Sequence, residues 1–208
     1  MIEVYTAHTP NGVKVTIALE EMGVPYDLHI LSLSAKDQKK PDFLAINPNG
    51  RIPAIIDNDG PNGKTIRVFE SGAILLYLAE KYGKLLPNDP QDRIDAIAWA
   101  FFQTGGIGPI MGQAGFFKKN FPDFQDGFYR FNSESHRLVS VLEGVLKHKN
   151  YLAGDDLSIA DIMNFGWLDM APNYFGFDMS PYSAASAWLD RMSSRDGVKK
   201  GMAALKGR

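Results

Sequence analysis

Strand patterns occupy only the first part of this chain, and this restriction limits its possible folds more than any other feature. The predicted segments are, in order, a strand at 2–5, a helix at 15–22, a strand at 26–31, a helical turn led by Pro41, strands at 52–56 and 65–69, and a helix at 73–82. A helix between two strands favours a right-handed parallel pair, whereas the turn-rich connection at 57–64 favours an antiparallel hairpin. The sequence therefore predicts a βαβ-ββα unit of the α/β class.

Helical periodicity continues alone after Gln91. Helices are expected at 91–104, 128–146, 159–171, 184–193 and 198–205. Residues 83–90 lie between the two kinds of pattern and carry Gly, two prolines, Asn and Asp, the composition of a linker. We therefore expect an α/β domain at 1–82, a linker at 83–90 and an all-α C-terminal domain at 91–208.

The charge balance excludes several classes of partner. Lys and Arg total 22 against 24 for Asp and Glu, and the sequence has no basic stripe of the kind that binds nucleic acid. The longest apolar runs are far too short to cross a bilayer. The first residues open directly into a strand pattern, without the basic and apolar regions of a signal peptide. We expect a cytoplasmic protein with small-molecule partners and with no nucleic-acid or membrane partner.

The chain contains no cysteine. This excludes a disulfide scaffold, a Cys zinc ligand, a protein thiolate nucleophile and a CxxC redox pair. The four histidines lack the close spacing of metal ligands, so no metal is expected, and His8 is interpreted as a surface residue. Any thiol chemistry must therefore use a thiol that a ligand brings.

One candidate binding site lies where the predicted strand at 65–69 becomes a helix. Glu70 and Ser71 stand at that junction. A helix N-terminus has unpaired N–H groups and partial positive charge, which suit an anionic group, and Glu70 beside it could accept from an ammonium. A small zwitterion would satisfy both. The alternative is that Ser71 only caps the helix and Glu70 only complements its dipole.

Ile52-Pro53 is a second candidate feature. A proline that enters a strand has no N–H to donate, and a cis bond there would turn the backbone groups of Ile52 toward solvent. From physics alone a trans proline at a sheet edge is expected, because the trans form is favoured.

Two features of the helical part predict structure rather than chemistry. Ser158 and Asp161 form a shortened capping box, which predicts a well-defined helix start. The stretch Gly105-Gly106-Ile107-Gly108 follows a helical pattern instead of a strand, so it fails the dinucleotide fingerprint and predicts a break or kink where something packs closely.

These features together resemble the cytosolic glutathione S-transferases, over essentially the whole chain. The stretches that look most like the bacterial Nu-class members are Thr9-Pro10-Asn11-Gly12, Gln38, Asn47 to Ile55, Phe69 to Lys81, and Gly105 to Pro109. The resemblance implies a thioredoxin-like first domain, a homodimer, a cis Pro53, and glutathione or glutathione disulfide as ligand. It also implies strong disulfide-bond reductase activity and weak conjugating activity.

The resemblance also assigns roles to single residues. Ile52 would pair its backbone with the cysteinyl part of glutathione, next to Pro53. Glu70 and Ser71 would hold the γ-glutamyl ammonium and carboxylate. The remaining positions are Gln38 at the glycyl end, Thr9 and Asn11 beside the sulfur as catalytic residues, and Arg130, which would reach the ligand of the partner subunit.

The role of Thr9 and Asn11 is physically plausible. A free thiol titrates near 8.5, and lowering its pKa by two units requires a preference of roughly 2.7 kcal/mol for the thiolate. Hydrogen bonds to a charged acceptor contribute about 1.5–3 kcal/mol each. A hydroxyl, a side-chain amide and a helix N-terminus can supply that preference without a protein thiol. The alternative is that both residues only cap the following helix.

Two other functions stay open at this point: conjugation of glutathione to small electrophiles, and a non-catalytic ligand-binding or interaction module. Tyr5 sits within the first strand, where it is interpreted as a packed aromatic instead of a catalytic tyrosine. The aromatics of the second domain are interpreted mostly as core. Those at 116–124 are expected in a loop, where some could line the electrophile side of the cleft.

Overall fold

The computed structural model describes residues 1–206, which divide into two compact units. The first unit contains residues 1–85 together with 194–206, and the second contains residues 86–193. The chain therefore leaves the first unit close to the predicted linker. The predicted helical domain at 91–208 differs from this division, because the last helix belongs with the first unit.

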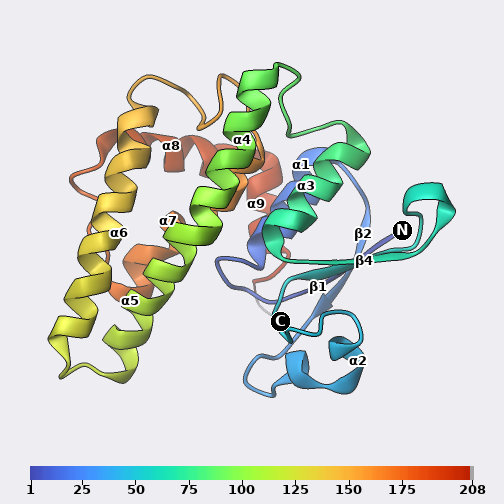
Figure 1. Ribbon diagram of the computed structural model, residues 1–208, viewed down its shortest axis with the longest axis horizontal. Coiled ribbons are helices and arrows are strands. Elements are labelled where there is room, and N and C mark those ends of the chain that lie inside the picture. Colours follow the sequence, from blue (N-terminus) through green and yellow to red (C-terminus); the bar gives the residue numbers. More distant parts are fainter. Residues whose placement is uncertain (207–208) are drawn as a thin grey trace. The chain divides into compact units, whose positions relative to one another are not determined.

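The first unit is built on a four-stranded mixed sheet (Figure 1). Its elements are β1 (Ile2–Thr6), α1 (Val13–Met22), β2 (Tyr26–Ile30), the 3-10 turn η1 (Asp37–Lys39), α2 (Pro41–Leu44), β3 (Ala54–Asp57), the 3-10 turn η2 (Pro61–Gly63), β4 (Ile66–Phe69), α3 (Ser71–Tyr82) and α9 (Asp196–Ala203). The strand order is β2-β1-β3-β4, with β1 parallel to β2 and antiparallel to β3. This is the predicted βαβ-ββα arrangement, that of a thioredoxin-like domain.

The apolar pattern of these segments explains the packing. In β1, residues Ile2 and Val4 are buried, while Glu3 and Tyr5 are half-buried. The helices α1 and α3 lie on one side of the sheet and α2 on the other (Figure 1). Helix α1 is buried along almost its whole length, from Val13 to Leu19, because α9 covers the side that the sheet and α3 leave open.

The contact between α1 and α9 depends on a glycine. A Cβ on Gly201 would lie 2.5 Å from the backbone of Ile17, so only glycine permits this approach. The Thr16 hydroxyl donates to the Gly201 carbonyl at 2.8 Å, and Arg195 forms a bidentate pair with Glu21 at 2.8 and 2.9 Å. Short-range sequence patterns do not contain this long-range contact, which explains why the last helix was expected elsewhere.

In the part of the chain that the structure describes, the regular elements of the second unit are all helices, apart from one isolated bridge between Tyr151 and Gly154. Its elements are α4 (Pro90–Phe102), the π-helical turn η3 (Gln103–Ile107), α5 (Gly108–Asn120), α6 (Gln125–Leu146), α7 (Ile159–Phe175) and α8 (Ser183–Ser194). The glycine-rich stretch at 105–108 interrupts α-helical hydrogen bonding with a π turn, as the sequence predicts.

Helix α5 is where the sequence-based expectation is wrong. Phe116 and Phe117, expected in a loop, lie on this helix, and the loop begins only at Phe121. Glycines lower helix propensity, but those of α5 permit tight packing on α7. A Cβ on Gly115 would lie 2.1 Å from the Tyr174 ring, and one on Gly112 would lie 3.3 Å from Trp167. Tertiary packing therefore overrides local propensity here.

The predicted capping box at the start of α7 is present. Ser158 Oγ accepts from the Ala160 N–H, and Asp161 accepts from the Ser158 N–H at 3.0 Å. The fully buried Asp161 carboxylate also accepts from the Leu152 N–H at 2.9 Å and from the Trp188 indole N–H at 3.0 Å. One side chain thus connects the preceding loop, α7 and α8.

Asp161→Ala is expected to lower the free energy of unfolding by about 3–5 kcal/mol, because four buried donors lose their acceptor. Urea denaturation followed by circular dichroism measures this change. The matched control is Asp156→Ala, at an exposed position of the same loop, for which a change within about 0.5 kcal/mol is expected. A loss below about 1 kcal/mol in Asp161→Ala would contradict the assigned role.

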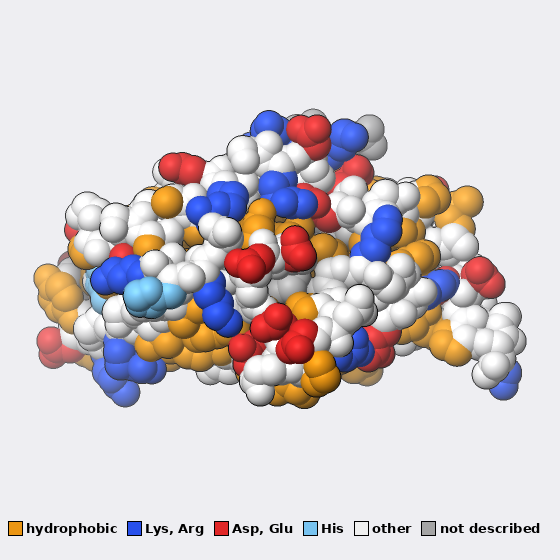
Figure 2. Space-filling model, turned by 90° about the horizontal axis from the view of Figure 1, so that it is seen from above, with side chains coloured by type: hydrophobic (Ala, Val, Ile, Leu, Met, Phe, Trp, Pro, Cys, Tyr) orange, Lys and Arg blue, Asp and Glu red, His pale blue; other side chains and the backbone are white. Residues whose placement is uncertain are grey.

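The charged surface agrees with the balanced composition. On the face drawn in Figure 2, Lys and Arg side chains are interspersed with Asp and Glu, and apolar side chains lie between them. Among the described residues, no helix combines the length and the apolar character needed to span a membrane.

Candidate ligand-binding site

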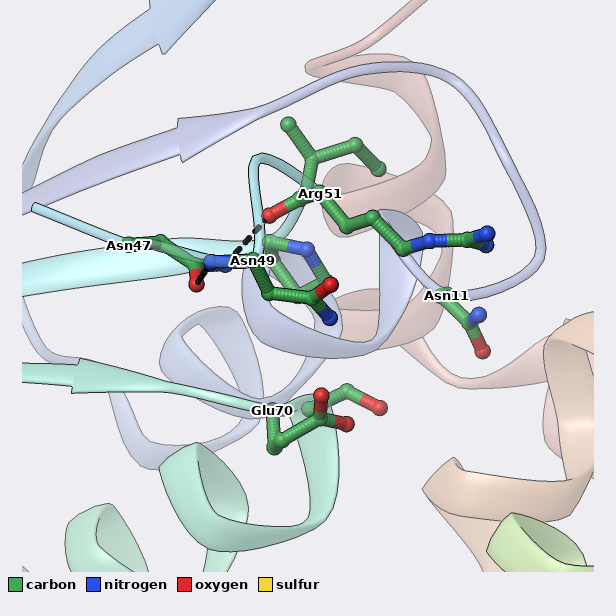
Figure 3. A pocket seen from close by; sticks show the side chains of 8 residues that line it. Asn11, Asn47, Asn49, Arg51 and Glu70 are labelled. Atoms are coloured by element: carbon green, nitrogen blue, oxygen red, sulfur yellow. Dashed lines mark hydrogen bonds between the residues drawn. The ribbon is translucent and has the colours of Figure 1, made fainter. Parts of the chain in front are cut away.

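A pocket of about 300 Å³ opens in the first unit, where three separate segments meet (Figure 3). Its lining residues are Asn11, Asn47, Asn49, Arg51, Ile52, Pro53, Glu70 and Ser71. They come from the turn before α1, the loop before β3, and the start of α3. Five of them are predicted site residues: Asn11, Ile52, Pro53, Glu70 and Ser71.

The Ile52–Pro53 peptide bond is cis, as the family resemblance implied and against the expectation from physics alone. Asn47 holds the loop that carries this bond. Its buried side-chain amide donates to the Arg51 carbonyl at 2.6 Å and accepts from the Asn49 N–H at 3.0 Å (Figure 3). The backbone on the N-terminal side of Pro53 is therefore fixed before any ligand arrives.

Glu70 has an unusual backbone conformation, with φ 70° and ψ 118°. Positive φ is unfavourable for a residue with a Cβ and costs on the order of 1–3 kcal/mol. Glu70 occupies the N-cap position of α3 but makes no side-chain cap hydrogen bond there, and its side chain lies at the pocket. Ser71 is therefore the first residue of the helix, and Glu70 occupies the cap position. The alternative in which Ser71 only caps the helix is wrong for this reason.

A buried lysine lies beneath this end of the pocket. Lys14, on the first turn of α1, is fully buried. Its Nζ donates to Asn11 Oδ1 at 2.8 Å and to Ser71 Oγ at 3.3 Å. Burial lowers the pKa of Lys14 well below its usual range, and the nearby Glu70 carboxylate raises it again.

Thr9 lies next to the pocket-lining residues. Its hydroxyl oxygen accepts from the Gly12 N–H at 2.9 Å, and its carbonyl accepts from Val13. Thr9 therefore stabilises the turn that presents Asn11, as the helix-cap alternative describes. In the bond from Gly12 the Thr9 hydroxyl is the acceptor. A hydroxyl can also donate its proton in a second hydrogen bond, because donating and accepting use different parts of the group.

The pocket combines both signs of charge. The Arg51 side chain extends along its mouth toward Asn11, and the Glu70 carboxylate faces it from the start of α3 (Figure 3). The N-terminus of α3 adds partial positive charge beside Ser71. A ligand with carboxylates, an ammonium and a backbone-like amide matches this arrangement, and these are the groups of a small peptide.

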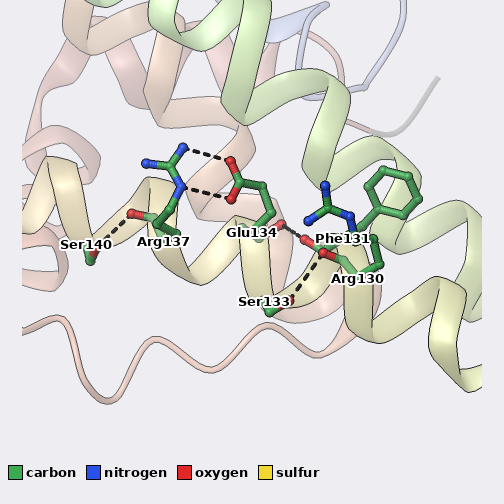
Figure 4. A network of polar contacts seen from close by, with 7 residues as sticks. Arg130, Phe131, Ser133, Glu134, Arg137 and Ser140 are labelled. Carbon is green, nitrogen blue, oxygen red and sulfur yellow. Dashed lines mark hydrogen bonds and ion pairs between the residues drawn. The ribbon is translucent and has the colours of Figure 1, made fainter.

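Besides Thr9, two further predicted site residues lie outside the pocket lining. Gln38 is on η1, where its backbone carbonyl lies against Gly50 and its side-chain oxygen is buried without a hydrogen-bond partner. Arg130 is exposed on α6 of the second unit, one turn before the ion pair of Glu134 with Arg137 (Figure 4). Its charge helps to lower the pKa of Glu134, after the larger effect of the Arg137 hydrogen bond.

Tyr5 and His8 do not line the pocket. The Tyr5 hydroxyl donates to Glu3 at 2.8 Å, and its ring stacks on His29 with centroids 4.4 Å apart. Burial, and then the hydrogen bond to Glu3, raise the pKa of Tyr5 to about 12. Tyr5 is thus a packed aromatic, and His8 is exposed, as expected.

Sequence reasoning missed Asn47, Asn49 and Arg51 as pocket residues, having treated them only as a turn, and it missed Lys14 altogether. The position of Asn47, Asn49 and Arg51 next to Ile52-Pro53 in the sequence could have identified them as pocket residues. For Lys14 the signal was its neighbours, since Val13, Val15, Ile17 and Leu19 make α1 apolar on nearly every side. A helix of that kind is buried, and its charged residue must then have a partner.

A thioredoxin-like unit with a cis-proline loop facing a helix start, joined to a helical unit, defines the glutathione transferase class of fold. Residues 9–81 match the N-terminal domain of glutathione S-transferases, and residues 131–196 match their C-terminal domain. The chain belongs to the glutathione S-transferase family.

Individual relatives match nearly the whole chain. The disulfide-bond oxidoreductase YfcG of Escherichia coli (strain K12) is 40% identical over 208 residues, covering 99% of this chain and 95% of YfcG. A glutathione transferase of Burkholderia graminis, solved with two glutathione molecules per subunit, has a TM-score of 0.93 and 41% identity, with coverage of 100% and 89%. One from Pseudomonas putida, with one glutathione disulfide per subunit, has a TM-score of 0.92 and 39% identity, with coverage of 99% and 92%.

Proposed function

We propose that this protein is a glutathione-dependent disulfide-bond reductase that uses the thiolate of bound glutathione as its nucleophile. The observation that carries the proposal is the pocket itself, which joins Asn11 to the cis-proline loop and to the start of α3 in a chain without cysteine. Since the protein supplies no thiol, the nucleophilic sulfur comes from the ligand.

The reaction is two successive thiol–disulfide exchanges. The glutathione thiolate attacks one sulfur of the substrate disulfide, forming a mixed disulfide and releasing the other substrate sulfur as a thiolate. A second glutathione thiolate attacks the glutathione sulfur of the mixed disulfide, which forms glutathione disulfide and releases the remaining substrate thiolate. Two glutathiones are oxidised and one disulfide is reduced, and the two protons of the glutathione thiols end on the two product thiols.

The pocket residues have distinct roles in this proposal. Glu70 holds the γ-glutamyl ammonium, and Ser71 with the N-terminus of α3 holds the γ-glutamyl carboxylate. The backbone of Ile52, fixed by cis-Pro53, pairs with the cysteinyl part. Three further roles are proposed: Gln38 at the glycyl end, Thr9 and Asn11 as hydrogen-bond donors to the sulfur, and Arg130 from the partner subunit of a homodimer.

Exchange is favoured over conjugation by the number of glutathione units that the relatives hold. The Burkholderia protein binds two glutathiones per subunit, and the Pseudomonas protein binds one glutathione disulfide. Two glutathiones are consumed in the exchange and glutathione disulfide is its oxidised product, whereas conjugation needs one glutathione and an electrophile. YfcG carries the disulfide-bond oxidoreductase name. Assignment to the Nu class is supported by the sequence stretches that resemble its members, among them Thr9 to Gly12 and Phe69 to Lys81.

The proposed homodimer and cytoplasmic location rest on separate observations. On α4, Ile94 and Phe101 are exposed to 59% and 71%, and seven residues apart they lie on one face of the helix. Exposed apolar side chains on one face mark an interface, and a second copy of the chain is the proposed partner. A cytoplasmic location supplies the reduced glutathione that the reaction consumes.

The test is reduction of 2-hydroxyethyl disulfide by glutathione. Thr9→Ala is expected to lower kcat about 10–100-fold, because one hydrogen bond to the thiolate is lost. Thr9→Ser keeps the hydroxyl and is the matched control, with a rate close to wild type. An unchanged rate in Thr9→Ala would remove the assigned role.

Two further measurements test the alternative functions. If calorimetry detects no binding of glutathione or glutathione disulfide, a non-catalytic module is favoured. If turnover of 1-chloro-2,4-dinitrobenzene dominates, conjugation is favoured.

A further inference from the structure

Lys14 is the one basic side chain that is buried among the residues the structure describes. Lysines are rarely buried to this degree unless their charge is paired and hydrogen-bonded, because an ammonium loses its hydration on burial. Lys14 lies behind the pocket lining instead of in it. A chain that needed only to fill this space could do so with an apolar residue, so the amine needs an explanation.

The hydrogen bonds of Lys14 join two sides of the pocket. Asn11 belongs to the turn before α1, and Ser71 begins α3, 57 residues further along the chain than Lys14. The Lys14 Nζ lies 2.8 Å from Asn11 Oδ1 and 3.3 Å from Ser71 Oγ. One buried group therefore fixes the distance between the proposed sulfur end of the pocket and the proposed γ-glutamyl end.

The chemistry of an ammonium also decides how the Asn11 amide is oriented. A lysine ammonium has three donors and no acceptor, so the amide atom that faces it must be the oxygen. The amide nitrogen of Asn11 then occupies the opposite end of the planar group. An amide held in this way offers N–H donors, rather than a carbonyl oxygen, to a ligand on its far side.

The ligand and Lys14 influence each other through charge. Burial favours the neutral amine, and the Glu70 carboxylate opposes that effect. An anionic ligand acts in the same direction as Glu70, so binding of glutathione favours the ammonium, the form that has only donors.

We propose that Lys14 is a positioning residue for thiolate formation: it holds Asn11 and Ser71 together and orients the Asn11 amide so that its N–H end faces the glutathione sulfur. This inference rests on the proposed function, because it requires glutathione with its sulfur at Asn11. Lys14 itself does not touch the ligand.

The test measures the pKa of the bound glutathione thiol, from the ultraviolet absorbance of the thiolate as pH is raised, in wild type and in Lys14→Met. Methionine has a similar length and no donor. Without the ammonium the Asn11 oxygen loses the Lys14 donor that orients the amide, and the pKa of the bound thiol is expected to rise by about one unit, which reduces the thiolate about tenfold at a pH below both values. The KM for glutathione is expected to change less than kcat.

A matched control separates positioning from packing. Thr16→Val, two residues along the same buried helix, removes the hydrogen bond to Gly201 of α9 and is expected to lower stability without moving the thiol pKa. Lys14→Met leaves the Asn11 and Ser71 oxygens without their donor and is expected to lower the melting temperature as well as to raise the thiol pKa. A purely structural lysine would lower the melting temperature in the same way but would leave the thiol pKa unchanged, as Thr16→Val does.

Each outcome decides one of the two claims. If wild type lowers the pKa of the bound thiol and Lys14→Met does not alter it, the positioning role is overturned and the proposed function stands. If glutathione bound to wild type titrates like free glutathione, the proposed thiolate mechanism fails, and the inference fails with it. If Lys14→Met does not fold, Lys14→Leu provides the same test, since leucine also has no donor for the Asn11 oxygen, and an unchanged thiol pKa again overturns the role.

Discussion

Glu70→Gln is expected to raise the Kd for glutathione about 30–150-fold. Among substitutions in the pocket that change so few atoms, this is the largest expected loss of affinity. Glutamine keeps the shape of the side chain and an acceptor oxygen but removes the charge that is proposed to pair with the γ-glutamyl ammonium. Hydrogen bonds to charged groups contribute about 1.5–3 kcal/mol, and the upper part of that range gives the expected change. Isothermal titration calorimetry with reduced glutathione measures it.

A second substitution at the same residue should separate binding from stability. Glu70 holds φ at 70°, which glycine adopts without a steric penalty. Glu70→Gly therefore relieves the backbone strain, but it also removes the carboxylate that favours the buried Lys14 ammonium, so the free energy of unfolding is expected to change by less than about 1 kcal/mol while measurable glutathione binding is abolished. Lost binding at nearly unchanged stability would show that the strained backbone is retained to place the carboxylate in the pocket.

The matched control is Asn62→Gly. Asn62 also has positive φ, at 59°, but it is exposed on η2 and does not line the pocket. Its replacement is expected to leave glutathione affinity unchanged. If Glu70→Gln binds glutathione as tightly as wild type, the ammonium is held elsewhere, and the proposed orientation of the tripeptide is wrong.

Local patterns were sufficient for most of the first unit. Strand alternation in β1 and β2, and the Gly23 stop of α1, are properties of short segments, and the structure contains each of them. The capping box at Ser158 is equally local. In contrast, the contact of α9 with α1 depends on Gly201 lying against Ile17, 184 residues away in sequence (201 − 17), and no local pattern encodes such a distance.

The site was predictable in part. Glu70 and Ser71 could be chosen because a strand-to-helix junction has its own electrostatics. The cis state of Pro53 could not, since steric preference alone favours trans and the loop that fixes it is held by Asn47 across the turn. Lys14 was missed because its significance depends on its burial, and burial of a charged residue is decided by tertiary structure.

The strained Glu70 and the buried Lys14 have a common meaning. Glu70 has a positive φ, which is unfavourable for a residue with a Cβ, and Lys14 is a charged residue in a buried position. Both lie at the same end of the pocket. Folded proteins retain such costs mainly where function requires them. The Lys14 ammonium, the Glu70 carboxylate and the Asn11 amide therefore form one arrangement, and a change of charge at Asn11 should disturb all of it.

Asn11→Asp is expected to lower kcat for disulfide reduction about 100–1,000-fold, the largest rate effect of any single substitution considered. The carboxylate keeps an oxygen toward Lys14 but replaces the N–H donor with a negative charge beside the sulfur. Loss of a charge-assisted hydrogen bond accounts for about 1.5–3 kcal/mol, and repulsion between two anions adds to it. Reduction of 2-hydroxyethyl disulfide at saturating glutathione measures the change.

The pH dependence of the rate shows whether Asn11→Asp raises or lowers the pKa of the bound glutathione thiol. A negative neighbour disfavours the thiolate, so the pKa of the bound glutathione thiol rises in Asn11→Asp. Activity requires the thiolate, and the rising limb of the pH–rate profile should therefore move to higher pH than in wild type. Because the proposed contacts that hold the tripeptide are mainly those at Glu70, Ser71 and Ile52, the KM for glutathione should change much less than kcat.

Asn49→Asp makes the same change of charge in the same pocket but at the loop before β3. It is expected to weaken glutathione binding without moving the pH–rate profile. If both variants weaken binding alike and neither moves the profile, the sulfur does not lie at Asn11. If only Asn11→Asp moves it, the thiolate is stabilised by an amide whose direction is set from behind by a buried lysine, which explains how a chain without cysteine can carry out thiol chemistry.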